Sequence, residues 1–184
     1  MAKKNETIDV SRRNFLMGFR KLREEEPGEA QTPVASTDET FDLLKEANLA
    51  YKDRNWEPAR EKYEAFLKKE SRNPNARFRL GRCLYETGKY IQAKIQFEQV
   101  LRLRREDQDA TLFLGLSLMR LDRPEKAAVI WRMYMNPKAM PIQREVNIQL
   151  AFIEDTSMET PLPADMAAAV EGAVEEYRLQ KLKG

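Results

Sequence analysis

The 184-residue sequence contains no histidine and a single cysteine, Cys83. Histidine is the commonest general base, the commonest metal ligand and the usual pH switch, so its absence argues against catalysis and against a metal site. One cysteine cannot form a disulfide within the chain, and export to an oxidising compartment therefore gains no support. We expect Cys83 to be a small, buried, apolar residue. We predict that the chain is not an enzyme and that it uses no metal and no cofactor.

Long apolar runs and charge of one sign are also lacking. No run approaches the roughly 18 apolar residues that a membrane-spanning helix needs. Basic and acidic residues number 32 and 30, so the balance gives no reason to expect a nucleic acid partner. A basic cluster at Arg102, Arg104 and Arg105 is better explained by the negative end of a helix dipole. The seven glycines and the abundance of Ala, Leu, Glu, Lys and Arg favour helix.

A 34-residue period runs through the middle of the sequence. Two columns hold small residues, one holds aromatic residues, and one holds large side chains. They are Ala47/Gly81/Gly115, Ala59/Ala93/Ala127, Tyr63/Phe97/Trp131 and Tyr51/Tyr85/Met119. Small residues allow two antiparallel helices to approach closely, and the aromatic residue one turn after each alanine fills the space between them. Four columns with one period and no gap indicate repeated helical hairpins.

These residues resemble the tetratricopeptide repeat (TPR), a 34-residue unit of two helices. The second unit matches most fully, in Leu80-Gly81, Tyr85, Gly88, Tyr90, Ala93 and Phe97. The third matches in Leu114-Gly115, Leu118, Ala127 and Trp131, whereas the first has Glu46-Ala47 for the usual Leu-Gly and Arg54 for the usual Gly. The resemblance covers residues 40–136. It implies an all-α fold, a right-handed α-solenoid of about three TPR helix pairs.

We expect the paired helices at 39–53 and 57–70, 75–87 and 90–103, and 108–121 and 124–135. Two more, at 141–155 and 164–182, are predicted to cap the solenoid, because its terminal elements need one polar face. We therefore divide the chain into an N-terminal arm (1–23), a flexible linker (24–38), TPR repeats (39–138), and a degenerate repeat with capping helices (139–184).

The N-terminal arm is predicted to be a tethered amphipathic helix that docks on another surface. One helical stripe carries its apolar residues, and arginines flank it; the docking residues are Arg12, Arg13, Phe15, Leu16, Phe19 and Leu22. We expect docking on protein, either this chain or a partner. Contact with an anionic membrane surface is the alternative, and it would be weak with so small an apolar face.

Within this arm, Ser11-Arg12-Arg13-Asn14-Phe15-Leu16 resembles the twin-arginine export motif. A working signal continues into an apolar region and a small-residue cleavage site. Here Arg20-Lys21-Leu22-Arg23 and three glutamates follow, so export is not predicted. We expect a cytoplasmic protein, with a position peripheral to the inner membrane as the alternative. The motif weakly favours a bacterial source.

The TPR resemblance implies a groove lined by the first helix of each pair. Carried over position by position, the partner-binding residues are Asn48, Tyr51, Phe78, Arg79, Arg82, Tyr85, Leu112, Leu116, Met119 and Arg120. An aromatic and apolar floor with fixed cations suits a peptide or helix with hydrophobic anchors and acidic groups. The clamp that some TPR domains use for chaperone tails is incomplete, because Leu44 and Asn75 replace two of its residues. For Leu112 and Leu116, cover by the chain's own helices is the alternative.

Together these features predict a protein-binding adaptor or scaffold, an accessory subunit of a larger complex. The alternative is a peripheral membrane-associated assembly factor for a respiratory or exported redox enzyme, targeted by residues 10–23.

Overall fold

The computed structural model describes residues 38–155, 157 and 159–183. This part of the chain contains eight helices and no strand, and contacts group Asp38–Gly184 as one unit. The predicted N-terminal arm, with its six docking residues, lies outside the described residues, as does the predicted linker apart from Asp38, where the first described helix begins. Both remain predictions.

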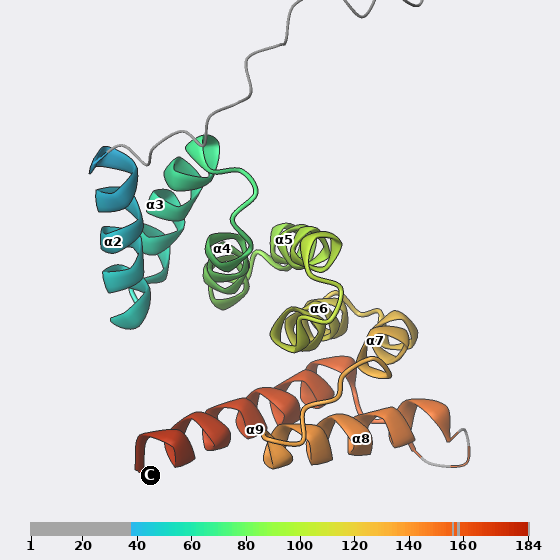
Figure 1. Ribbon diagram of the computed structural model, residues 1–184. Coiled ribbons are helices and arrows are strands. Elements are labelled where there is room, and N and C mark those ends of the chain that lie inside the picture. Colours follow the sequence, from blue (N-terminus) through green and yellow to red (C-terminus); the bar gives the residue numbers. More distant parts are fainter. Residues whose placement is uncertain (1–37, 156, 158, 184) are drawn as a thin grey trace, which may run out of the picture. The chain divides into compact units, whose positions relative to one another are not determined.

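The first six described helices form three hairpins that follow one another along the chain (Figure 1). They are α2 (Asp38–Lys52) with α3 (Trp56–Lys69), α4 (Pro74–Glu86) with α5 (Tyr90–Leu103), and α6 (Gln108–Arg120) with α7 (Pro124–Trp131). The first helices of successive pairs contact each other, α2 with α4 and α4 with α6. We call the surface that these three helices share the α2–α4–α6 wall. The arrangement confirms the predicted all-α solenoid of helix pairs.

The turn inside each hairpin repeats the same backbone geometry at the 34-residue period. Arg54, Gly88 and Asp122 have left-handed φ values of 58°, 74° and 57°. The next residue in each turn donates its backbone N–H to a carbonyl five residues back, as Lys89 does to Leu84 at 2.8 Å. This is the Schellman motif, which favours glycine because other residues are strained at left-handed φ. Arg54 and Asp122 therefore hold a conformation that their side chains disfavour.

The starts of α4 and α6 also follow the period. The side chain of Asn73 accepts a hydrogen bond from the N–H of Ala76 at 3.0 Å. Asp107, 34 residues later, accepts from the N–H of Ala110 at 2.9 Å. Each cap satisfies a backbone donor that the helix leaves unpaired at its first turn. The boundaries of these helices are thus encoded locally.

The contact between the two helices of a pair depends on the small residues and the aromatic residues of the repeat. Phe97 and Trp131 are 0% and 1% exposed. A Cβ at Gly81 would lie 2.7 Å from the Phe97 ring, and one at Gly115 would lie 2.0 Å from Nε1 of Trp131. That indole Nε1 also donates to the carbonyl of Leu112 at 3.2 Å. In both pairs the aromatic ring therefore rests directly on the backbone of the first helix.

Helix α7 ends at Trp131, earlier than the predicted 135. The chain tightens into two turns, in which Met133 donates to Ile130 and Tyr134 donates to Trp131. Tyr134 is thereby turned into the core, where it is 3% exposed. Burial of this ring favours the early turn over another turn of helix.

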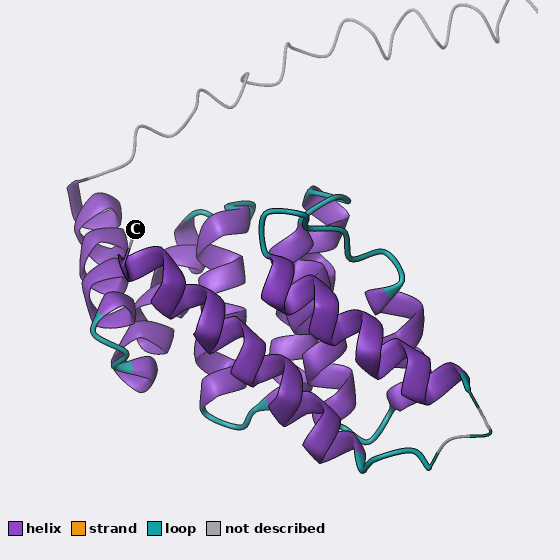
Figure 2. Cartoon of the chain, turned by 90° about the horizontal axis from the view of Figure 1, so that it is seen from below, coloured by secondary structure: helices purple, strands orange, loops and turns teal. Residues whose placement is uncertain are grey.

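The remaining helices are α8 (Met140–Glu154) and α9 (Pro163–Lys183), and they pack against each other. In addition, α8 packs against α7, and α9 packs against α6. In Figure 2 the helix that ends at the C label is α9, which runs beside α8 and across the helix pairs. Met166, Ala167, Val170 and Ala173 of α9 join the same hydrophobic core as the repeats. Every residue of α6 from 110 to 119 is buried. Such a helix is covered on all sides, and α9 supplies part of that cover.

Candidate partner-binding site

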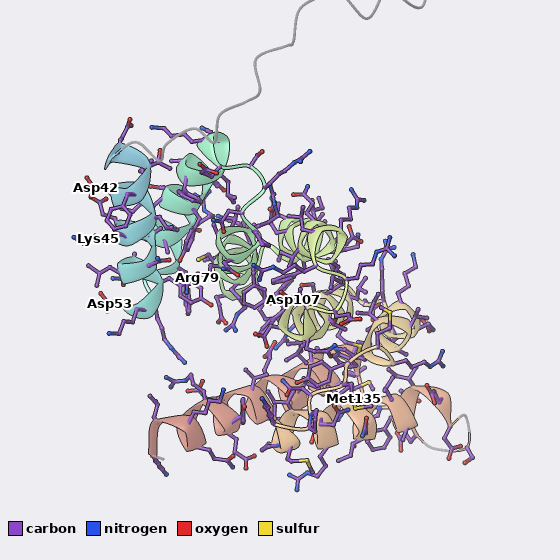
Figure 3. All side chains as sticks on the ribbon, viewed as in Figure 1. Asp42, Lys45, Asp53, Arg79, Asp107 and Met135 are labelled. Atoms are coloured by element: carbon purple, nitrogen blue, oxygen red, sulfur yellow. The ribbon has the colours of Figure 1, made fainter. Side chains whose placement is uncertain are left out.

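The first two hairpins supply a partly exposed surface of aromatic and cationic side chains. Asn48, Tyr51, Phe78, Arg79 and Arg82, all predicted groove residues, are half-buried here. Figure 3 shows Arg79 between α2 and α4. Its guanidinium donates to the Asn48 side chain and lies 5.6 Å from the centre of the Tyr51 ring. The structure thus places Arg79 beside Asn48 and Tyr51, as the repeat pattern predicts. The role of these residues in binding a partner remains a prediction.

Arg82 is the most constrained cation of this surface. Its guanidinium carbon lies 3.9 Å from the centre of the Phe113 ring, within the range of a cation–π interaction. One terminal nitrogen donates to Glu86, one turn later, at 2.6 Å. The Nε donor is buried and has no acceptor among the described residues. A buried donor without a partner is unfavourable, so this side chain retains unused hydrogen-bonding capacity.

In the third hairpin the groove prediction is wrong for three residues. Leu112, Leu116 and Met119 are 2%, 0% and 1% exposed. They belong to the hydrophobic core that α6 shares with α9, so they offer no surface to a partner. The physical reason is that the apolar face of α9 covers the apolar face of α6, because both would otherwise meet water.

Helix α9 also engages the two remaining predicted groove residues. Glu171 accepts two hydrogen bonds from the guanidinium of Arg120, at 3.0 and 2.5 Å, and one from the hydroxyl of Tyr85. The hydrogen bonds that Arg120 donates to Glu171 raise the pKa of Arg120. Burial, together with the same carboxylate, raises the pKa of Tyr85. A bidentate pair of this kind is among the stronger side-chain interactions, so Glu171 fixes α9 to α4 and α6 together.

One turn later on α9, Glu175 accepts from Arg54, at the turn after α2, at 3.0 Å. Glu175 also accepts hydrogen bonds from Arg178 of its own helix. The bonds from both arginines lower the pKa of Glu175 to about 2, and those from Arg178 have the largest effect. Sequence reasoning missed Glu171, Glu175 and the role of Arg54. A signal was present in Arg54, a large side chain at a position where the repeat favours glycine.

These groups line a cleft of about 300 Å³ between the α2–α4–α6 wall and α9. Its charged lining consists of three arginines and three glutamates, namely Arg54, Arg82, Arg120, Glu86, Glu171 and Glu175. Aromatic side chains, Tyr85, Tyr90 and Phe113, form the rest of the lining with Val174. With α9 in place, the charges of the cleft balance.

Cys83 is confirmed as a buried residue and is 0% exposed. Burial raises the pKa of its thiol to about 12. The thiolate is the reactive form of cysteine, so Cys83 is a packing residue at neutral pH. Among the described residues no group of three or more Cys, Asp or Glu side chains is placed to hold a metal ion.

The sequence of the hairpins matches a known family model. The model is described as tetratricopeptide repeat, and it matches residues 44–93 and 88–131. The two matched segments together span residues 44–131, which hold the helices α3 to α7 and most of α2, so the match and the 34-residue geometry agree. No curated protein matches the chain at a significant level.

Several solved structures share the fold of this chain. The TPR domain of Arabidopsis OM64 has a TM-score of 0.53 and 19% identity, covering 60% of this chain and 95% of that domain. The first TPR of Spaghetti (RPAP3), bound to the HSP90 peptide SRMEEVD, has a TM-score of 0.53 and 18% identity, covering 61% of this chain and 93% of that chain. The Yersinia enterocolitica type III secretion translocator chaperone SycD has a TM-score of 0.51 and 15% identity, covering 79% of this chain and 96% of that chain. At identities this low, the structural similarity shows a shared fold and no more than that.

None of the helices in the described part of the chain is both long and apolar enough to cross a membrane. This finding agrees with the absence of long apolar runs in the sequence.

Proposed function

We propose that this chain is a protein-binding TPR adaptor, an accessory subunit of a larger complex that holds a partner segment on the first two hairpins. The observation that carries the proposal is the half-buried set Tyr51, Phe78, Arg79 and Arg82, which α9 leaves accessible while it covers the third hairpin. Rigid aromatic and arginine side chains at a desolvated surface are typical of binding hot spots. Among the structural neighbours, the first TPR of Spaghetti (RPAP3) is bound to an HSP90 peptide, and SycD is a secretion translocator chaperone.

The proposal predicts that a charge reversal on this surface removes a partner while the fold persists. We expect Arg82→Glu to lose at least one protein that wild type retains in affinity purification with mass spectrometry. Arg105→Glu is the matched control, because Arg105 is exposed in the turn between α5 and α6. Circular dichroism of both variants checks that the helices remain. Identical sets of co-purifying proteins for all three forms would contradict the proposal.

A second candidate function rests on the sequence Ser11-Arg12-Arg13-Asn14-Phe15-Leu16. Its likeness to the twin-arginine motif suggests a peripheral, membrane-associated assembly factor for a respiratory or exported redox enzyme. We expect deletion of residues 1–24 to move the protein from the membrane fraction to the soluble fraction of a bacterial lysate. Replacing Arg12 and Arg13 by lysine, which keeps the charge, separates recognition of the motif from simple attraction to anionic lipid. A distribution that the deletion does not change would remove this candidate.

A further inference from the structure

The two halves of α9 differ in how they are held. In the first half, Met166, Ala167, Val170 and Ala173 are buried in the core. From residue 174 to 183 no side chain is fully buried, and Leu179 and Leu182 are 44% and 71% exposed. The second half is therefore attached far less firmly than the first. We call residues 174–183 the strap.

A glycine lies at the boundary between these halves. Gly172 is exposed, and a Cβ built on it would meet nothing within 4 Å. Packing therefore does not require glycine here, in contrast to Gly81 and Gly115. Glycine is disfavoured inside a helix because it loses more backbone freedom than other residues. Its position between Glu171 and Glu175 places the weakest point of the helix beside the two carboxylates that bind the wall.

Two strap side chains, Val174 and Tyr177, pack against the core while only partly buried, and one ion pair joins the strap to the wall. Glu175 pairs with Arg54, and the two side chains are 44% and 53% exposed. An ion pair with this exposure contributes little to stability and is screened by salt. If the strap left the wall, Glu175 would keep its bonds to Arg178, which lies on the strap itself. Glu171, on the firmly held half, would keep Arg120.

Departure of the strap changes the charge of the cleft. With Glu175 in place, three arginines face three glutamates. Without it, Arg54 has no carboxylate among its described contacts, and the cleft has one arginine in excess. Arg82, with its buried and unpartnered Nε donor, lies in the same cleft. The uncovered surface would therefore favour a carboxylate at the position that Glu175 occupies.

We propose that the strap is a removable cover that opens at Gly172, and that its competitor is an acidic segment of a partner protein whose carboxylate replaces Glu175 on Arg54, in the cleft that Arg82 also lines. The inference rests on the proposed function, since it names the chemistry of the partner for the same surface. Because Glu171 stays bound to Arg120, the strap vacates one carboxylate position, that of Glu175 on Arg54. The segment that fits this site therefore places one glutamate side chain there.

The test uses the full chain and a defined probe. The probe is an alanine-based helical peptide that carries glutamates, and its control carries glutamine at the same positions. Affinities are measured by fluorescence anisotropy for wild type, Glu175→Gln, Gly172→Ala and Glu176→Gln. The last is a matched charge control, because Glu176 is exposed and bonds only Gln180 among its described hydrogen bonds.

We expect Glu175→Gln to bind the glutamate peptide about three- to tenfold more tightly than wild type, and Gly172→Ala up to about fivefold more weakly. The glutamine peptide should not bind, and Glu176→Gln should match wild type. Hydrogen–deuterium exchange of wild type should be at least tenfold faster in 174–183 than in 164–173. Equal exchange in both halves, equal affinity of all variants, or no binding of the glutamate peptide would overturn the inference. If the inference failed in this way while Arg82→Glu still lost a partner in affinity purification, the proposed function would stand.

Discussion

Replacing Gly115 by alanine should destabilise the protein by about 3 kcal/mol. The added Cβ would lie 2.0 Å from Nε1 and 2.4 Å from Cδ1 of Trp131. The ring cannot swing away freely, because it is 1% exposed and its Nε1 donates to the carbonyl of Leu112. Helices α6 and α7 must therefore move apart, and the side chains between them lose packing contacts.

Two other glycines in helices provide graded controls for this substitution. A Cβ at Gly81 would lie 2.7 Å from the Phe97 ring, so Gly81→Ala should cost less than Gly115→Ala. At Gly172 a Cβ has open space, and Gly172→Ala should stabilise by up to about 1 kcal/mol through helix propensity. Urea unfolding followed by circular dichroism gives the order of the three variants. A Gly115→Ala protein as stable as wild type would show that the indole does not rest on this backbone.

The helix pairs were predictable because the signals that set them are local and repeat every 34 residues. Asn73 and Asp107 cap their helices with their own side chains, and Gly88 takes the left-handed φ that ends α4. The close contacts of Gly81 and Gly115 follow from small residues facing aromatic ones in the same columns. Each feature needs only residues within one repeat, so the sequence pattern was sufficient.

The position of α9 was not predictable in the same way, because it depends on contacts between residues far apart in the sequence. The Glu171–Arg120 pair joins positions 51 residues apart, and no periodicity relates them. One clue was nonetheless available. Residue 48 is Asn and residue 82 is Arg, whereas the equivalent residue of the third unit is Leu116. A groove position that changes from polar to apolar at the last repeat indicates cover by another element.

The column that contains Asn48, Arg82 and Leu116 gives the second large prediction. If all three positions faced an open groove, a glutamate would be tolerated at each of them. In the structure Leu116 is 0% exposed, so Leu116→Glu must bury an unpaired carboxylate or expel α9. We expect it to lose about 4 kcal/mol or more, a large part of the stability of a typical domain.

The equivalent substitution two repeats earlier is the matched control. Asn48 accepts hydrogen bonds from Arg79 and from the hydroxyl of Tyr63, and both donors would be satisfied by a carboxylate. Asn48→Glu should therefore change the stability by no more than about 1 kcal/mol. Thermal and urea unfolding of the two variants measure the difference. If Leu116→Glu proved as stable as Asn48→Glu, α9 would not cover the third hairpin in solution, and the groove would extend along all three hairpins. If it unfolds as expected, partner binding is confined to the first two hairpins, and the C-terminal helix sets that limit.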